Sequence, residues 1–194
     1  MFYGLRPRER APNDRMRHCT GRQESDRMGL VSRITPCLWY ADTAEEAATA
    51  YCDIFPNSRI VRVLRYDAAS ARAANRPKGS VLTVEFELDR QSFTALNGGP
   101  LFRFNESISF VVRCDTQDDI DHYWDALGRG GDPMAQQCGW LKDRFGVSWQ
   151  VVPAWLPDWL TDADPARAAR VMRTMLAMRK LDLAPLQAAY DAEA

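Results

Sequence analysis

The sequence predicts an α+β fold of two tandem β-α-β-β-β modules with a C-terminal helix. The main observation is a short Asp-Thr pattern that occurs at 42–47 and again at 115–120, each time directly after a strand-like apolar run. At the same offset Tyr51 of the first copy corresponds to Trp124 of the second, so the repeat continues along the following helix. Such a fixed-offset repeat indicates a duplicated supersecondary unit. A hydrophobic content of 46% is enough for a packed core, and a fold of two similar halves usually has its cleft between them.

The first module begins with a predicted strand at 34–40. Thr43 and Glu46 form a capping-box pattern, and apolar residues at spacings of three and four then predict a helix that ends at Pro56. The segment 67–78, rich in Ala and Arg, is predicted to be a loop. The remaining strands of this module are predicted at 59–66, 81–88 and 92–96.

The second module repeats this order. A strand is predicted at 108–114, and Thr116 with Asp119 gives another capping box for a helix that ends at the glycine-rich segment 128–131. The last three strands are predicted at 134–137, 139–142 and 147–152.

Composition divides the chain into three parts. Residues 1–29 are rich in Arg and lack apolar periodicity, which predicts a disordered N-terminal extension. Met28 directly precedes the first strand and could be the true start, so whether residues 1–27 are translated in vivo stays open. Residues 30–153 form the two-module domain, with modules at about 33–100 and 106–153. Residues 154–194 form a helical tail, in which Asp164 can cap a helix that starts at Pro165. We expect this helix to dock on its own sheet or on a partner subunit, or else to act as a basic membrane or calmodulin-like helix.

Charge and cysteine usage restrict the partners and the compartment. A net charge of −1 provides no bulk field for nucleic acid or an anionic membrane, and no apolar run approaches the ~18 residues of a membrane span. The five cysteines include no C-x-x-C pair. We therefore expect reduced thiols and a cytoplasmic protein without nucleic-acid or membrane partners.

Strand alternation predicts which side chains line the cleft. In the strand at 81–88, the even-numbered residues are apolar and should face the helices, which leaves Thr83 and Glu85 on the concave side. The same alternation predicts that Leu38 and Tyr40 of the first strand point into the cleft. The predicted ligand-binding residues are Tyr40, Thr83, Glu85, Asn97, Ser107, Ser109, Ser148 and Gln150.

Several of these residues have a second interpretation. Glu85 is the best catalytic candidate, as a general base if desolvation raises its pKa, or it lies at the wet edge of the sheet. Gln150 either binds a ligand oxygen or satisfies a backbone group. Asn97 either ends its strand with a positive φ or presents an amide at the pocket mouth. Cys138 lacks a histidine partner, which favours a structural thiol.

The sequences of several segments resemble the PhnB-like branch of the vicinal oxygen chelate superfamily. This superfamily includes glyoxalase I, bleomycin-resistance and extradiol dioxygenase proteins. The resemblance is carried by 34–40, 51–58, 79–86, 93–99, 137–143 and 145–153. It implies the glyoxalase/bleomycin-resistance fold and a homodimer that pairs modules between chains. Members of this branch are often labelled 3-demethylubiquinone-9 3-methyltransferase.

The resemblance also implies where a divalent metal would bind. The four ligand positions of the superfamily fall on Ile34, Thr94, Ser107 and Gln150, and only Gln150 has a metal-compatible side chain. Because such sites need three or more converging ligands, we expect no metal. The glycine pairs do not open a helix as an S-adenosylmethionine cradle would, and we expect no cofactor.

Three functions are compatible with the sequence. The first is a metal-independent protein that binds an unknown small molecule between its modules. The second is an enzyme of lyase, isomerase or dioxygenase type that uses Glu85 or a recruited divalent metal. The third is a structural or regulatory dimer with a filled cleft. Whether the protein is an enzyme, and which ligand it takes, stay open at this point.

Overall fold

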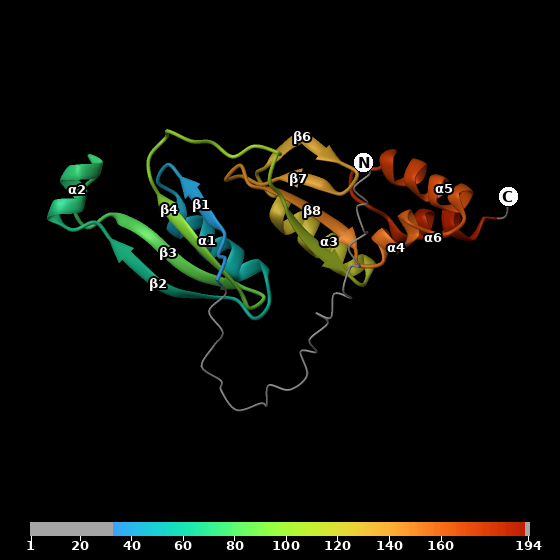
Figure 1. The fold of residues 1–194 in the computed structure, drawn as a ribbon, viewed down its shortest axis with the longest axis horizontal. Helices are drawn as coiled ribbons and strands as arrows, with labels where there is room; N and C mark the ends of the chain where they lie inside the picture. The colour runs from blue at the N-terminus through green and yellow to red at the C-terminus, as the bar shows by residue number, and fades with distance from the viewer. Residues whose placement is uncertain (1–32, 193–194) are drawn as a thin grey trace, which may run out of the picture. The chain divides into compact units, whose positions relative to one another are not determined.

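The computed structural model describes residues 33–192, and these form two four-stranded sheets with six helices. The predicted α+β fold of two repeated modules with a C-terminal helix is confirmed. Figure 1 shows the two sheets, with α1 lying against the first and α3 against the second. The predicted disordered extension at 1–29 lies outside the described residues.

The first sheet has the strand order β1-β4-β3-β2. Its outer strand β1 runs parallel to β4, whereas the other neighbours are antiparallel. A parallel pair needs a crossover, which the chain makes through α1, β2 and β3. The elements are β1 (Cys37–Tyr40), α1 (Ala44–Ile54), β2 (Arg59–Arg65), β3 (Val81–Leu88) and β4 (Gln91–Asn97).

A short helix, α2 (Ala68–Ala74), occupies the segment that was predicted to be a loop. Its N-cap is Asp67, whose carboxylate accepts hydrogen bonds from the backbone N–H groups of Ala69 and Ser70. The helix ends at Asn75, which has a left-handed φ of 52°. The loop prediction is therefore wrong, because an Asp cap and a run of good helix formers suffice for two turns.

The second sheet repeats the first with the order β5-β8-β7-β6, and β5 is again parallel to β8. The capping box of Thr116 and Asp119 is present as predicted. Thr43, by contrast, makes no side-chain cap, so the first capping box is not formed. The elements are β5 (Phe110–Cys114), α3 (Gln117–Gly128), β6 (Asp132–Gln137), β7 (Trp140–Lys142) and β8 (Ser148–Pro153).

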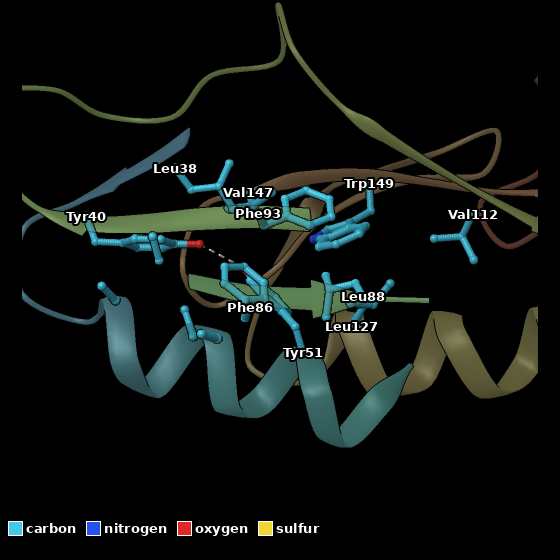
Figure 2. Packing of buried hydrophobic residues seen from close by; sticks show 14 of the residues in the cluster. Leu38, Tyr40, Tyr51, Phe86, Leu88, Phe93, Val112, Leu127, Val147 and Trp149 are labelled. Atoms are coloured by element: carbon cyan, nitrogen blue, oxygen red, sulfur yellow. Dashed lines mark hydrogen bonds between the residues drawn. The ribbon is translucent and has the colours of Figure 1, made fainter. Parts of the chain in front are cut away.

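One aromatic core joins the two modules. Phe93 of β4 packs edge-on against Phe110 of β5, with ring centroids 5.3 Å apart, and Phe110 continues to Trp149 of β8. Phe55, just after α1, stacks on the same tryptophan at 5.5 Å. Figure 2 shows Phe93 and Trp149 lying between the strands and α1. Each such ring pair contributes about 0.5–1.5 kcal/mol to stability beyond the effect of its buried area. Because these pairs join residues of both modules, the modules share one core.

A buried carboxylate lies next to this core. Asp143, in the turn between β7 and β8, is only 5% exposed. Its Oδ2 accepts hydrogen bonds from the Tyr51 hydroxyl at 2.7 Å and from the Trp149 indole at 2.8 Å. Its Oδ1 accepts from the backbone N–H groups of Phe145 and Val147. Burial raises the pKa of Asp143, and these four donors oppose that shift.

The Asp143 bond to Tyr51 crosses from the second module to the first. The Tyr40 hydroxyl of β1 lies 3.4 Å from the Tyr51 hydroxyl, as Figure 2 shows, and continues the chain of contacts. Burial is the main reason that the pKa values of both tyrosines are raised, so both stay neutral. The polar chain therefore links β1, α1 and the β7–β8 turn inside an apolar environment.

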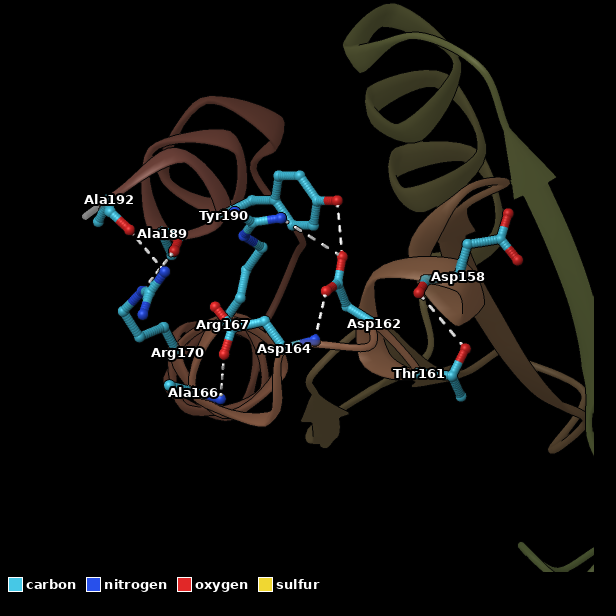
Figure 3. A network of polar contacts seen from close by, with 10 residues as sticks. All are labelled: Asp158, Thr161, Asp162, Asp164, Ala166, Arg167, Arg170, Ala189, Tyr190 and Ala192. Carbon is cyan, nitrogen blue, oxygen red and sulfur yellow. Dashed lines mark hydrogen bonds and ion pairs between the residues drawn. The ribbon is translucent and has the colours of Figure 1, made fainter. Parts of the chain in front are cut away.

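The tail contains three helices where the sequence predicted one: α4 (Leu156–Leu160), α5 (Pro165–Leu176) and α6 (Leu183–Asp191). Trp155, Trp159 and Tyr190 stack with centroid distances of 3.8 and 4.1 Å, and Arg167 covers the tyrosine ring. Asp162 accepts the Tyr190 hydroxyl at 2.8 Å, in the network of Figure 3. These contacts join α6 to the two helices before it.

The tail docks on the second module of its own chain. The backbone N–H groups of Cys138 and Gly139 donate to the carbonyls of Met178 and Arg179, both at 2.8 Å. Gln117 at the start of α3 accepts from the Leu183 N–H at 2.9 Å. The segment after α5 makes these contacts, whereas α5, the helix predicted to dock on its own sheet or on a partner subunit, packs on α4 and α6. No helix within residues 33–192 has the length and apolarity needed to span a membrane.

Replacement of Asp143 tests the buried carboxylate. The variant Asp143→Ala leaves two side-chain donors and two backbone donors without their acceptor, and we expect it to lower the free energy of unfolding by about 3–5 kcal/mol. Urea denaturation followed by tryptophan fluorescence measures this change. Asp53→Ala, an exposed carboxylate on α1, is the matched control and should change stability by less than about 0.5 kcal/mol. A loss below about 1 kcal/mol for Asp143→Ala would contradict the assigned role.

Candidate functional site

The pleat of the first sheet decides which predicted site residues can meet a ligand. On β3, Thr83 and Glu85 face away from α1, as predicted, because Val84 and Phe86 fill the core. Glu85 is paired with Arg62 on β2, whose Nη2 lies 2.6 and 2.7 Å from the two carboxylate oxygens. The glutamate side chain is 40% exposed. The desolvation that a general base would need is therefore not provided at this position.

Leu38 and Tyr40 do not lie on the face of β1 that was predicted to turn toward the ligand, although Leu38 reaches the edge of the cavity described below. Leu38 and Tyr40 face α1 and are 7% and 3% exposed, whereas Cys37 and Trp39 lie on the other face. The register with β4 fixes this, because Cys37 pairs with Thr94. Both faces of β1 are apolar in sequence, so alternation alone could not choose between them. Tyr40 is consequently a core residue whose hydroxyl contacts Tyr51.

Asn97 does not take the positive φ predicted for it, and its side chain is held by hydrogen bonds within the fold. It is 4% exposed and remains extended at the end of β4, and the positive φ falls on Gly99 at 88°. Its Oδ1 accepts from the Ala44 N–H at 2.9 Å, and its Nδ2 donates to the Val81 carbonyl at 3.2 Å. Asn97 thus supplies the α1 cap that Thr43 does not make.

On the second sheet, the predicted inward residues lie on the face away from α3. Val111 pairs with Gln150 in the register of β5 and β8. The Gln150 amide donates to the Ser109 hydroxyl at 2.8 Å, so these two predicted residues meet and hydrogen-bond each other. Val152, farther along β8, packs against the tail helices. The polar part of this face is therefore limited to its beginning.

A cavity of about 430 Å³ lies where the two modules meet. We call it the junction cavity, and its walls come from the start of β1, the linker before β5 and the start of β8. It includes two of the predicted ligand-binding residues, Ser107 and Ser148. The lining residues are Pro36, Cys37, Leu38, Arg103, Phe104, Asn105, Ser107, Ile108, Phe110, Val147 and Ser148.

Ser148 is the buried polar residue of this set. It is 2% exposed, and its hydroxyl has no hydrogen-bond partner among the described residues. Asn105 and Ser107 are exposed, and the Ser107 hydroxyl donates to the Asn105 Oδ1 at 2.5 Å. A smaller cavity of about 210 Å³ is lined by Tyr51 and Asp143, but both groups already bond to each other. The junction cavity is therefore the better candidate for a ligand.

Sequence reasoning missed Arg103. This residue precedes β5 in the linker between the modules, and no motif marks it. A cation in an inter-module linker is a weak signal, because most linker charges only contact solvent. Its position in the cavity wall results from how the two modules pack.

The four positions implied for a metal do not form a metal site. Thr94 and Ser107 offer neutral hydroxyls, Ile34 offers no donor, and the Gln150 amide already bonds to Ser109. Within residues 33–192, no group of three or more His, Cys, Asp or Glu side chains is placed to hold a metal ion. The donor set does not fit a divalent cation, which needs several anionic or imidazole ligands.

The two glycine clusters have packing roles. A Cβ on Gly98 would lie 2.1 Å from the Trp39 ring, and one on Gly131 would lie 2.1 Å from the Lys142 carbonyl oxygen. Gly98 follows β4 and Gly131 follows α3, so neither opens a helix. The close approach of Trp39 and β7 explains these glycines, and they do not fit the phosphate or S-adenosylmethionine cradle of a strand-to-helix turn.

Comparison with known proteins identifies the family. The model of the family described as 3-demethylubiquinone-9 3-methyltransferase matches residues 32–152. The chain belongs to this family. The predicted resemblance to PhnB-like proteins is therefore confirmed. Among curated proteins, none matches the sequence significantly.

Solved structures of related proteins resemble this chain over the two modules. A putative 3-demethylubiquinone-9 3-methyltransferase, PhnB protein, from Bacillus cereus is 31% identical with a TM-score of 0.53, covering 62% of this chain and 98% of that one. A Pseudomonas aeruginosa protein is 18% identical over 62% and 96% of the two chains, with a TM-score of 0.46. The fosfomycin resistance protein FosX from Listeria monocytogenes is 12% identical over 66% and 96%, with a TM-score of 0.43.

The structural role of Asn97 can be tested separately from binding. Asn97→Ala removes the α1 cap and leaves the Ala44 N–H and the Val81 carbonyl unsatisfied, and we expect the free energy of unfolding to fall by about 2–3 kcal/mol. Chemical denaturation measures the loss. Gln137→Ala, an exposed amide on β6, is the control and should change stability by less than about 0.5 kcal/mol. Equal stability of the two variants would contradict the capping role.

Proposed function

We propose that the protein binds a small organic molecule in the junction cavity without a metal. The observation that carries this proposal is the Ser148 hydroxyl, which is buried at the cavity wall without a hydrogen-bond partner among the described residues. An unsatisfied buried hydroxyl costs about 1–3 kcal/mol, and a ligand that bonds to it would recover that cost. Native structures retain such groups rarely, and a binding site is one reason for doing so.

The size and lining of the cavity support the same proposal. A volume of about 430 Å³ falls within the usual range of ligand pockets, roughly 300–1,000 Å³. Phe104, Ile108 and Val147 give apolar walls, and the polar groups are few, as is typical of sites that take small molecules. The enzyme alternative based on Glu85 has no comparable support, since that carboxylate is exposed and paired with Arg62.

We also propose that the protein is a homodimer. Several large apolar side chains of the described residues are strongly exposed, among them Leu101 at 74%, Ile108 at 71% and Met134 at 84%. Exposed apolar side chains of this size are commonly covered by a second subunit in symmetric oligomers. Ile108 also lines the junction cavity, so a second copy would reduce the solvent access of the ligand.

The variant Ser148→Ala tests the binding proposal. Removal of an unsatisfied hydroxyl should raise the stability of the free protein by about 1 kcal/mol and weaken binding of a cavity ligand about five- to tenfold. Thermal-shift screening of metabolites supplies the ligand, and calorimetry compares its affinity for the two proteins. Ser92→Ala on β4, outside the cavity, is the control. A screen without a reproducible ligand, or a Ser148→Ala variant destabilised by more than about 1 kcal/mol, would contradict the proposal.

The mass and the metal content of the purified protein test the proposed dimer and the proposed absence of a metal. Light scattering should give the mass of two chains at micromolar concentration, and a monomer at these concentrations would contradict the dimer. Protein purified without chelator should contain no Zn, Ni, Mn or Fe in stoichiometric amount. One metal ion per chain, measured by plasma mass spectrometry, would contradict metal-independent binding.

A further inference from the structure

We propose that the junction cavity is specific for monoanions with an apolar body, whose carboxylate or similar group is held by Arg103. This inference rests on the proposed function, because it names the chemical class of the ligand that the cavity takes. It depends on the charge of the cavity wall, on the hydrogen-bonding state of its polar groups and on the character of its remaining surface.

Among the described residues that line the cavity, Arg103 is the only charged one. No ion pair joins it to a carboxylate within residues 33–192. The acid nearest to it along the chain, Glu106, is paired with Lys142, and this contact holds the pKa of the Glu106 carboxyl below its usual value. The Arg103 guanidinium therefore gives the cavity wall one positive charge without a carboxylate partner among the described residues.

The other free polar groups of the cavity are hydrogen-bond donors. The Asn105 Oδ1 accepts hydrogen bonds from the Ser107 N–H at 3.0 Å and from the Ser107 hydroxyl at 2.5 Å. Both bonds use the oxygen, so the exposed Asn105 amide N–H₂ can still donate to a ligand. The Ser148 hydroxyl can donate as well, since it has no partner among the described residues. A guanidinium, an amide N–H₂ and a hydroxyl together form a set that suits an anionic acceptor.

The rest of the wall suits an apolar body of limited size. Leu38, Phe104 and Phe110 contribute aliphatic and aromatic surface, and the Phe104 ring is fixed edge-on against Tyr40 at 5.1 Å. No carboxylate is among the described residues that line the cavity, so a second, cationic group such as the ammonium of an amino acid would find no anionic partner there. The predicted class is therefore aromatic or branched aliphatic monocarboxylates rather than zwitterions.

Matched pairs of neutral and anionic probes test this class. Benzoate, 2-naphthoate and 4-methylpentanoate are compared with the corresponding primary amides by ligand-observed NMR and calorimetry. We expect each carboxylate to bind the wild-type protein about tenfold more tightly than its amide. Arg103→Gln should remove this preference and leave the affinity for the amides unchanged, whereas Arg72→Gln, on α2 and outside the cavity, should have no effect.

Cys37 gives an independent readout, because its thiol lines the same cavity. Burial raises the pKa of this thiol, so alkylation is measured at pH 8.5, with site-resolved mass spectrometry. A bound probe should slow alkylation of Cys37 by iodoacetamide several-fold and should leave Cys138, outside the cavity, unaffected. Protection of Cys37 by amides and carboxylates alike would overturn the anion preference and leave the proposed function intact. Absence of protection and of binding for every probe, including the ligand from the screen, would overturn both.

Discussion

The junction cavity depends on the buried carboxylate of Asp143. This residue fixes the β7–β8 turn by accepting the N–H groups of Phe145 and Val147, and the turn delivers Val147 and Ser148 to the cavity wall. The second oxygen of Asp143 bonds to Tyr51 of the first module, whose hydroxyl lies next to that of Tyr40 on β1. The same chain of contacts therefore places the two strands that face each other across the cavity. A neutral apolar residue at 143 could not satisfy these four donors, although it would avoid the cost of burying a charge.

The sequence was sufficient to predict the element order and the duplication, because both depend on local patterns such as apolar spacing, caps and turns. Its errors fell where local signals were weak or where a distant residue substituted for a local one. The helix α2 is only seven residues long and has no apolar stripe that would distinguish it from a loop. The cap of α1 came from Asn97 and not from Thr43, and a contact between residues 53 positions apart cannot be inferred from a capping-box pattern.

The candidate site was predictable only in part for a related reason. Ser107 and Ser148 were found through alternation and position, and both line the cavity. Tyr40 was misplaced because β1 is apolar on both faces and only its register with β4 decides which side is inward. Arg103 was missed because its importance arises from the packing of a linker against the starts of β1 and β8. The sequence also does not show which side chains form hydrogen bonds with each other. The Gln150 amide bonds to the Ser109 hydroxyl, whereas the Ser148 hydroxyl has no hydrogen-bond partner within the described residues.

Electrostatic selection by this protein would have to act at short range. The chain is almost neutral, with a net charge of −1, so no long-range field concentrates anions around it. Over the described residues, many acids are neutralised by nearby bases, in the pairs Arg59–Glu87, Arg62–Glu85, Arg65–Glu45, Lys142–Glu106, Arg144–Glu46, Arg167–Asp162 and Lys180–Asp121. Exposed pairs of this kind contribute little stability, but they remove competing charges from the surface. Arg103 is exposed but lines an apolar cavity and has no such partner among the described residues, and it is therefore where a charge can discriminate between ligands at short range.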